Sequence, residues 1–406
     1  MFVCAAQAQS LATIVLENVT SGNDRNNTVY GRVEVVDTNL TREEAIKLFT
    51  VGTPKDETDT ILAKMIASRV SIPSSTITGR DAKTGKEVNA TVVDILMTNI
   101  NKGAMERLTV GGAEGSFTTY DGQIATVKLG AIRVDSLNFA IPGQALKDGD
   151  TILGIFRPSK IVWQDIEVTG PVQGVAATAP GGNLIKIRLG SMAFDATYDG
   201  DIPLKVAGSI VNLLIEQPKA SEGGQALASI GYDKLDLGIT FTGTYDPASK
   251  AYTLSDFTLR GVDAGSLSVK AQLDGIERAM FLGSQPARMD AFSRAGISSL
   301  ELRFINDALV EKVFNYAAKR QGKWTETVRQ EASAMAIKVI PYLLGGDVTS
   351  LRAAETVSRF ILDPKRLTVT ATAKNGSLGI TELMNIRSPD LLSRKVDVQV
   401  TSDDAP

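Results

Sequence analysis

Residues Val127–Ser136 read Val-Lys-Leu-Gly-Ala-Ile-Arg-Val-Asp-Ser, so that apolar and polar side chains alternate on either side of a Gly-Ala pair. A second segment, Ile187–Ala196, reads Ile-Arg-Leu-Gly-Ser-Met-Ala-Phe-Asp-Ala and matches the first position for position in residue class. Alternation of this kind is typical of a half-buried β-strand. A glycine beside a small residue in the middle of a strand indicates a bulge or kink that curves it. The two segments therefore predict a repeated, curved strand unit.

Short elements of related sequence precede both segments, and weaker echoes lie on either side. The elements are Thr98-Asn99-Ile100 and Gln164-Asp165-Ile166, and the echoes are Glu17–Val19 followed by Val33–Asp37, and Ser255–Phe257 followed by Leu267–Asp274. We expect four copies of a strand-turn-strand unit, whose irregular separation favours a meander with insertions over a strict solenoid. The alternative is that any antiparallel sheet protein contains segments that look alike.

Helical patterns interrupt the strands in two regions. Thr41 and Glu44 have the spacing of a capping box and predict a short helix that reaches Phe49, followed by a second helix over Asp56–Arg69. After Ser298, apolar residues recur at helical spacing and predict three helices before Pro364.

The sequence thus predicts a mainly β fold with a helical insert (α+β): a long curved antiparallel sheet built from strand-turn-strand units, with three helices near the C-terminus. We divide the chain into a residual signal peptide (1–8), a β-rich repeat region with short helical inserts (9–297), a helical segment packing on the sheet (298–362), and closing strands with a tail (363–406). The helices are expected to cover one face of the sheet, or else to enclose with it a groove that holds an apolar ligand.

Composition excludes several functional classes. The 406 residues are 43% apolar and 22% charged, with a net charge of −3, which is typical of a soluble folded protein and not of one that binds nucleic acid. No apolar run approaches the roughly 20 residues that a membrane-spanning helix needs. Histidine is absent, which removes Ser-His-Asp and Cys-His catalysis and His-ligated metals, and we expect no cofactor.

The first nine residues resemble the end of a secretory signal. Ala6-Gln7-Ala8 fits the small-x-small pattern at which leader peptidase cleaves, which would make Gln9 the mature start; a native cytoplasmic start at Met1 is the alternative. Cys4 is the single cysteine, and it would leave with the signal. A chain without thiols suits an oxidising compartment, so we expect a Gram-negative periplasmic protein.

Carboxylates offer the remaining chemistry. Asp195, Asp199 and Asp201 could hold a calcium ion in a loop, although their spacing departs from the EF-hand pattern and favours a solvated turn. A pair of carboxylates from distant parts of the chain could also serve a hydrolase.

Two C-terminal segments carry a resemblance to known proteins. Phe360–Val369 and Ser388–Leu392, together with the meander of amphipathic strands and the helical insert, resemble uncharacterised periplasmic proteins of alphaproteobacteria and, more distantly, AsmA/TamB-like envelope proteins. The resemblance implies a curved sheet with an apolar inner face that handles lipid between the envelope membranes.

Three functional hypotheses follow. The first is a soluble periplasmic protein that binds or carries a lipid or another hydrophobic molecule; the second is a non-catalytic structural or protein-interaction component of the envelope; the third is a carboxylate-dependent hydrolase. The residues expected to line the apolar site of the first hypothesis are strand residues Ile132, Val134, Met192, Phe194, Leu237, Ile239 and Phe241, with helix residues Phe304 and Phe314.

Overall fold

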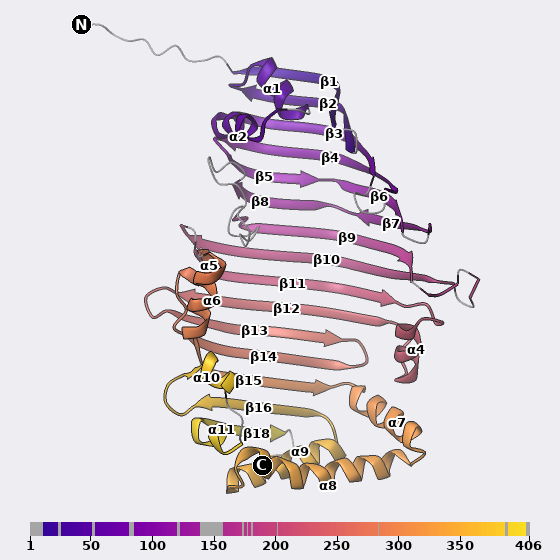
Figure 1. Ribbon diagram of the computed structural model, residues 1–406, viewed down its shortest axis with the longest axis vertical. Coiled ribbons are helices and arrows are strands. Elements are labelled where there is room, and N and C mark those ends of the chain that lie inside the picture. Colours follow the sequence, from indigo (N-terminus) through magenta and orange to yellow (C-terminus); the bar gives the residue numbers. More distant parts are fainter. Residues whose placement is uncertain are drawn as a thin grey trace. The chain divides into compact units, whose positions relative to one another are not determined.

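The computed structural model describes residues 11–22, 26–50, 53–80, 85–119, 122–138, 157–172, 174–176, 178–179, 182–200, 202–282, 284–385 and 389–402. Within these ranges the chain forms 18 antiparallel strands and ten helices, which confirms the predicted β-rich α+β class (Figure 1). The expected residual signal peptide, residues 1–8, lies outside the described residues. The chain divides into two compact units, residues 1–173 with 184–195, and residues 174–183 with 196–406.

In unit 1 most strands pair with the strands that precede and follow them in the sequence. Its strands are β1 (Ala12–Gly22), β2 (Asn26–Thr38), β3 (Ile66–Arg80), β4 (Glu87–Asn101), β5 (Ala104–Val110), β6 (Gly112–Thr118), β7 (Ile124–Leu129), β8 (Ile132–Asn138), β9 (Lys160–Pro171) and β10 (Leu184–Asp199, of which Leu184–Asp195 belong to this unit). In the middle of the unit β5 pairs with β8 and β6 with β7. Both β5 and β6 pair with β4, and both β7 and β8 pair with β9. Each of these pairs of short strands therefore acts as one long strand with a break in the middle.

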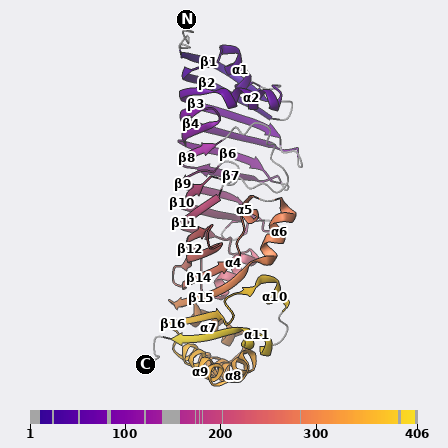
Figure 2. The same ribbon diagram turned by 90° about the vertical axis from the view of Figure 1, so that its left-hand side faces the viewer.

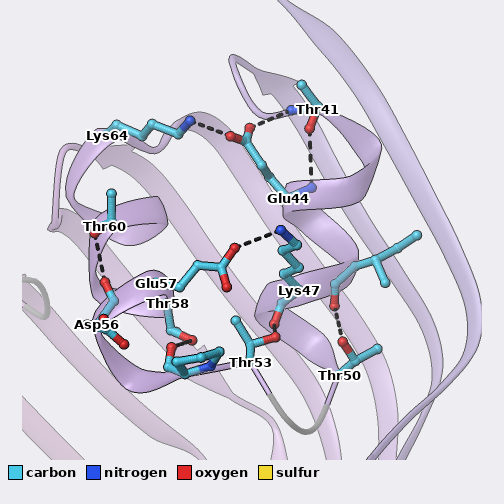
Figure 3. Close-up of polar contacts among 12 residues, drawn as sticks. Thr41, Glu44, Lys47, Thr50, Thr53, Asp56, Glu57, Thr58, Thr60 and Lys64 are labelled. Carbon is cyan, nitrogen blue, oxygen red and sulfur yellow. Dashed lines mark hydrogen bonds and ion pairs between the residues drawn. The ribbon is translucent and has the colours of Figure 1, made fainter.

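Helices α1 (Arg42–Phe49) and α2 (Lys55–Lys64) cover one face of the first strands of unit 1 (Figures 1 and 2). The predicted capping box is present: Thr41 Oγ1 accepts from Glu44 N–H, while the Glu44 carboxylate accepts from Thr41 N–H. Lys64 also donates to Glu44 and so ties the end of α2 to the start of α1, as Figure 3 shows. The fully buried Val33 and Val35 of β2 lie in the core beneath these helices.

Unit 2 also pairs its strands in order. Its strands are β11 (Ile202–Glu216), β12 (Leu235–Asp246), β13 (Ala251–Gly261), β14 (Gly265–Asp274), β15 (Gly296–Asn306), β16 (Arg366–Ala373), β17 (Leu378–Gly379) and β18 (Val396–Ser402). Neighbours from β11 to β16 pair antiparallel; β18 pairs with β16, and β17 with the beginning of β15. Its helices are α4 (Glu222–Ser229), α5 (Ala279–Leu282), α6 (Gln285–Arg294), α7 (Leu309–Gln321), α8 (Thr325–Leu344), α9 (Val348–Leu362), α10 (Ile380–Asn385) and α11 (Pro389–Lys395).

Two helix boundaries differ from those expected. The second insert ends at Lys64 instead of Arg69, because the residues from Ile66 onward pair with β2 and β4 as β3. The helical segment begins at Leu309 instead of residue 298, because Gly296–Asn306 form β15. Phe304, which we expected on a helix, is therefore a strand residue that pairs with Leu267 and Leu367.

Candidate functional site

The Gly-Ala break of the first repeat changes the alternation of unit 1 by one residue. Before the break the half-buried apolar positions are Val127 and Leu129, and after it they are Ile132 and Val134, while Lys128, Ala131 and Arg133 are exposed. In an uninterrupted strand Leu129 and Ile132, three residues apart, would face opposite sides of the sheet. The break therefore keeps all four apolar side chains on the more buried side.

A close approach between strands produces this break. Gly130 N–H donates to both Gln164 O and Asp165 O at 3.1 Å, and Asp165 has φ +50°. A Cβ on residue 130 would lie 2.6 Å from Gln164 O, so only glycine fits here.

The same arrangement, a glycine N–H bonded to two successive carbonyls of the next strand, recurs between β4 and the β5/β6 break. Gly111 N–H donates to Val93 O and Asp94 O, and Asp94 has φ +54°. The elements singled out in the sequence around Asn18, Asn99 and Asp165 also have a left-handed residue at their centre, with φ of 50–52°. The repeat is thus a repeat of bulges as well as of strands, since asparagine and aspartate tolerate this conformation better than other side chains do.

The four expected lining residues of unit 1 share one sheet face. Val134 pairs with Ile161, which pairs with Phe194; Ile132 pairs with Trp163, which pairs with Met192. Directly paired residues project to the same side of a sheet. These six side chains are all half-buried, so they form a continuous apolar row across β8, β9 and β10.

In unit 2 the two faces of the sheet differ sharply. One face carries an apolar row that starts at Ile239 and runs through Leu259, Leu267 and Phe304 to Leu367. A parallel row on this face comprises Phe241, Phe257, Val269, Leu302 and Val369.

The opposite face is polar. Thr240, Thr258 and Ser268 are paired in turn across β12, β13 and β14. The Thr240 and Thr258 hydroxyls both donate to Asp256, at 2.7 Å, and Thr258 shares a hydrogen bond with Ser268.

Helices cover the apolar face only in part. At one end of the strands Tyr245 packs against Phe281 of α5, and burial raises the pKa of the Tyr245 hydroxyl, which donates to Ile276 O. Further across the sheet the Phe360 ring of α9 contacts Phe304 edge-on, at 6.1 Å between centroids. Between these two contacts none of the described helices covers the face, and apolar side chains of β13 and β14 are left exposed.

The uncovered part forms what we call the β12–β14 patch: Ile239, Phe241, Phe257, Leu259, Leu267 and Val269. Phe257, Leu259 and Leu267 are 37%, 36% and 39% exposed. Apolar side chains that gather on one exposed face mark an interaction surface more often than scattered ones do. The patch is therefore the candidate functional site of unit 2.

The structure assigns the nine expected lining residues to separate places. Ile132, Val134, Met192 and Phe194 lie on the unit 1 row, while Ile239 and Phe241 belong to the patch, with Leu237 beside them on the same face of β12. Phe304 is on the patch face but beneath α9, and Phe314 of α7 lies against the Arg329 guanidinium of α8, 5.6 Å from the ring centroid.

The sequence analysis did not place four patch residues among the expected lining residues: Phe257, Leu259, Leu267 and Val269. Apolar and polar residues alternate in both of the segments that contain them, as in a half-buried strand. Trp163 lies between Ile132 and Met192 in the unit 1 row, and its indole N–H is buried without a hydrogen-bond partner among the described residues.

The structure describes two of the three carboxylates singled out for calcium, Asp195 and Asp199. Asp195 forms an ion pair with Lys160 at 3.4 Å, and Asp201 lies outside the described residues. Among the residues with described positions, no group of three or more acidic or cysteine side chains is arranged to hold a metal ion. None of the helices in those ranges combines the length and apolarity that crossing a membrane requires.

Comparison with known proteins gives little functional information. A family model described only as "Uncharacterized protein" matches residues 258–403, which run from β13 to β18 and include half of the β12–β14 patch. No curated protein matches the chain.

Proposed function

We propose that this protein binds or carries a lipid or another hydrophobic molecule in the cell envelope. The observation that supports this most is the β12–β14 patch, an apolar sheet face that no described helix closes over. Burying apolar area against a ligand gains roughly 25 cal/mol per Å², so a half-exposed patch of large side chains favours an apolar ligand. The resemblance to envelope proteins that handle lipid points the same way.

The neighbouring strand β15 supplies a matched control on the opposite face of the sheet. Ile305 of β15 is 39% exposed, as is Leu267 of β14, but Ile305 pairs with Ser266 and so lies on the opposite face. We expect native mass spectrometry of protein purified from cells, followed by lipid extraction, to find an apolar molecule in the wild type and in Ile305→Gln. Leu267→Gln should lose it. A wild type without any apolar adduct, or an equal loss in both variants, would contradict the proposal.

The proposed compartment is the periplasm, because of the residual signal pattern at residues 1–8 and the absence of thiols after it. Fractionation of cells that express the protein should place it with periplasmic markers. Recovery with cytoplasmic enzymes would contradict this part of the proposal.

A second candidate, a protein-interaction component of the envelope, is favoured by a different feature. Met335, Val339, Tyr342 and Leu343 recur at helical spacing on α8 and are 42–76% exposed. An apolar stripe on a helix suits the groove of another protein. A photo-crosslinking residue in place of Tyr342 should then capture one envelope protein in cells; the same residue in place of the exposed Gln330, on the other side of α8, is the control. Equal labelling from both positions would count against this candidate.

A further inference from the structure

A groove lies on the unit 1 sheet, and most of its lining side chains project from the face opposite the apolar row. It encloses about 710 Å³, within the range of small-molecule sites. A line of directly paired residues crosses its floor from β3 to β9: Ser71, Leu96, Thr109, Arg133 and Val162. With strands spaced by about 4.8 Å, these five positions span roughly 19 Å.

The groove follows the line of bulges described above. Asp94 and Gly111, one of the two bulge pairs, both line it, as does Ala131 beside Gly130. Pro73 lies opposite Asp94, where the pairing of β3 with β4 is interrupted. A break in strand pairing of this kind bends a sheet, which accounts for a hollow at this level of the strands.

Charged and apolar side chains both line the groove. Of the described charged residues, Arg69, Arg133 and Lys160 line it together with the acidic Asp94. Leu96 and Val162 supply an apolar floor between and beside these charges.

The carboxylate next to Arg133 is shared. Asp135 accepts from the Arg133 guanidinium and from Arg107, at 2.8 Å in both ion pairs, and its side chain is only 15% exposed. One carboxylate balances one of two guanidinium groups, so this corner keeps a positive charge at the groove wall. Lys160, the direct pairing partner of Asp135 on β9, bonds only loosely to the exposed Asp195, at 3.4 Å.

We infer that this groove binds an amphiphilic organic anion, with its acidic group at Arg133 and Lys160 and its apolar body running across Thr109 along Leu96. The site is separate from the β12–β14 patch and does not depend on the proposed function. Guanidinium groups pair well with both carboxylates and phosphates, so the shared chemistry is an acidic head on an apolar chain.

The probes are palmitate, hexadecyl phosphate and the neutral hexadecanol, with the two acids titrated below their micellar concentrations and the alcohol below its solubility limit. The wild type should bind the acids at least tenfold more tightly than the alcohol, as expected for a hydrogen bond between charged groups. The preferred acid distinguishes a carboxylate from a phosphate head group. Equal binding of acid and alcohol would overturn the inference.

Two variants locate the site. Arg133→Gln leaves Asp135 its bond to Arg107 and should bind the preferred acid at least tenfold more weakly, while its hexadecanol binding stays unchanged. Arg188→Gln removes an arginine of similar exposure on β10 outside the groove and should bind as the wild type does. Equal losses in the two variants would refute the inference. Leu267→Gln should keep acid binding, which separates this result from any test of the patch.

Discussion

Replacing Gly130 by alanine tests whether the bulges hold unit 1 together. The added Cβ would lie 2.6 Å from Gln164 O and 2.9 Å from Asp165 Cβ, and the first of these is a backbone atom that cannot rotate away. Relieving the overlap moves β9 away from the break and weakens the hydrogen bonds from Gly130 N–H to Gln164 O and Asp165 O.

The expected loss follows from these two effects. Overpacking typically costs about 1–3 kcal/mol, and a weakened backbone hydrogen bond adds about 1 kcal/mol, so unit 1 should lose about 2–4 kcal/mol of unfolding free energy. At a urea slope of about 2 kcal/mol per molar, the unfolding midpoint should fall by about 1–2 M.

Trp163 on β9, directly opposite Ile132, reports the unfolding of this region through its fluorescence. The exposed Trp324 of unit 2 is first replaced by phenylalanine so that one signal remains. Gly31→Ala is the control, because the nearest atom to its added Cβ is the Ser74 Oγ at 3.5 Å. If Gly130→Ala unfolds within about 0.3 M of that control, the close approach at the break does not restrain the fold.

Three further predictions concern the helices. Thr41→Ala removes the acceptor for Glu44 N–H and should cost about 1 kcal/mol in a thermal melt, so an unchanged Tm would mean that the cap is not used. The hydrogen bond from Lys64 holds the pKa of Glu44 below its usual range; the stability it adds is present above about pH 4.3 and is lost as pH falls through the lower folded-state pKa. Urea midpoints at pH 7 and pH 3 should therefore differ less in Glu44→Gln than in the wild type, and an equal difference would contradict this assignment. Phe360→Ala removes a buried ring from Phe304 and should cost about 3–5 kcal/mol by calorimetry, whereas a loss below about 1 kcal/mol would show that α9 does not seal this part of the sheet.

Local chemistry made several elements predictable. The capping box of α1 depends on Thr41 and Glu44, three residues apart, and needs no distant partner. The strands around Ile132 and Met192 were recognisable because alternation is a property of a single strand. Helix α9 ends at Leu362, before Pro364 as predicted, because proline disfavours a helical conformation in the residue before it.

Pairing between distant segments decided the elements that were predicted incorrectly. Leu302 and Ile305 have a spacing that fits a helix, but Gly296–Asn306 is held as a strand by hydrogen bonds to β14 and β16. The chain from Ile66 to Arg69 likewise continues a helical pattern until its pairing with β2 and β4 makes it a strand. The sequence of one segment does not show which distant strands will pair with it. Hydrogen bonding to those strands outweighs a weak local preference for helix.

For the candidate sites, the sequence alone established the residue types: strands with one apolar face, and no imidazole. Which apolar side chains stay exposed was decided by tertiary structure, because exposure of Leu259 and Leu267 depends on where α5 and α9 end. The groove beside Arg133 was equally invisible in sequence, since a left-handed Asp94 opposite Gly111 bends the sheet only when their two strands pair. The chemistry of a side chain depends on its residue type alone, whereas exposed apolar surfaces and grooves arise from contacts between segments that are distant along the chain.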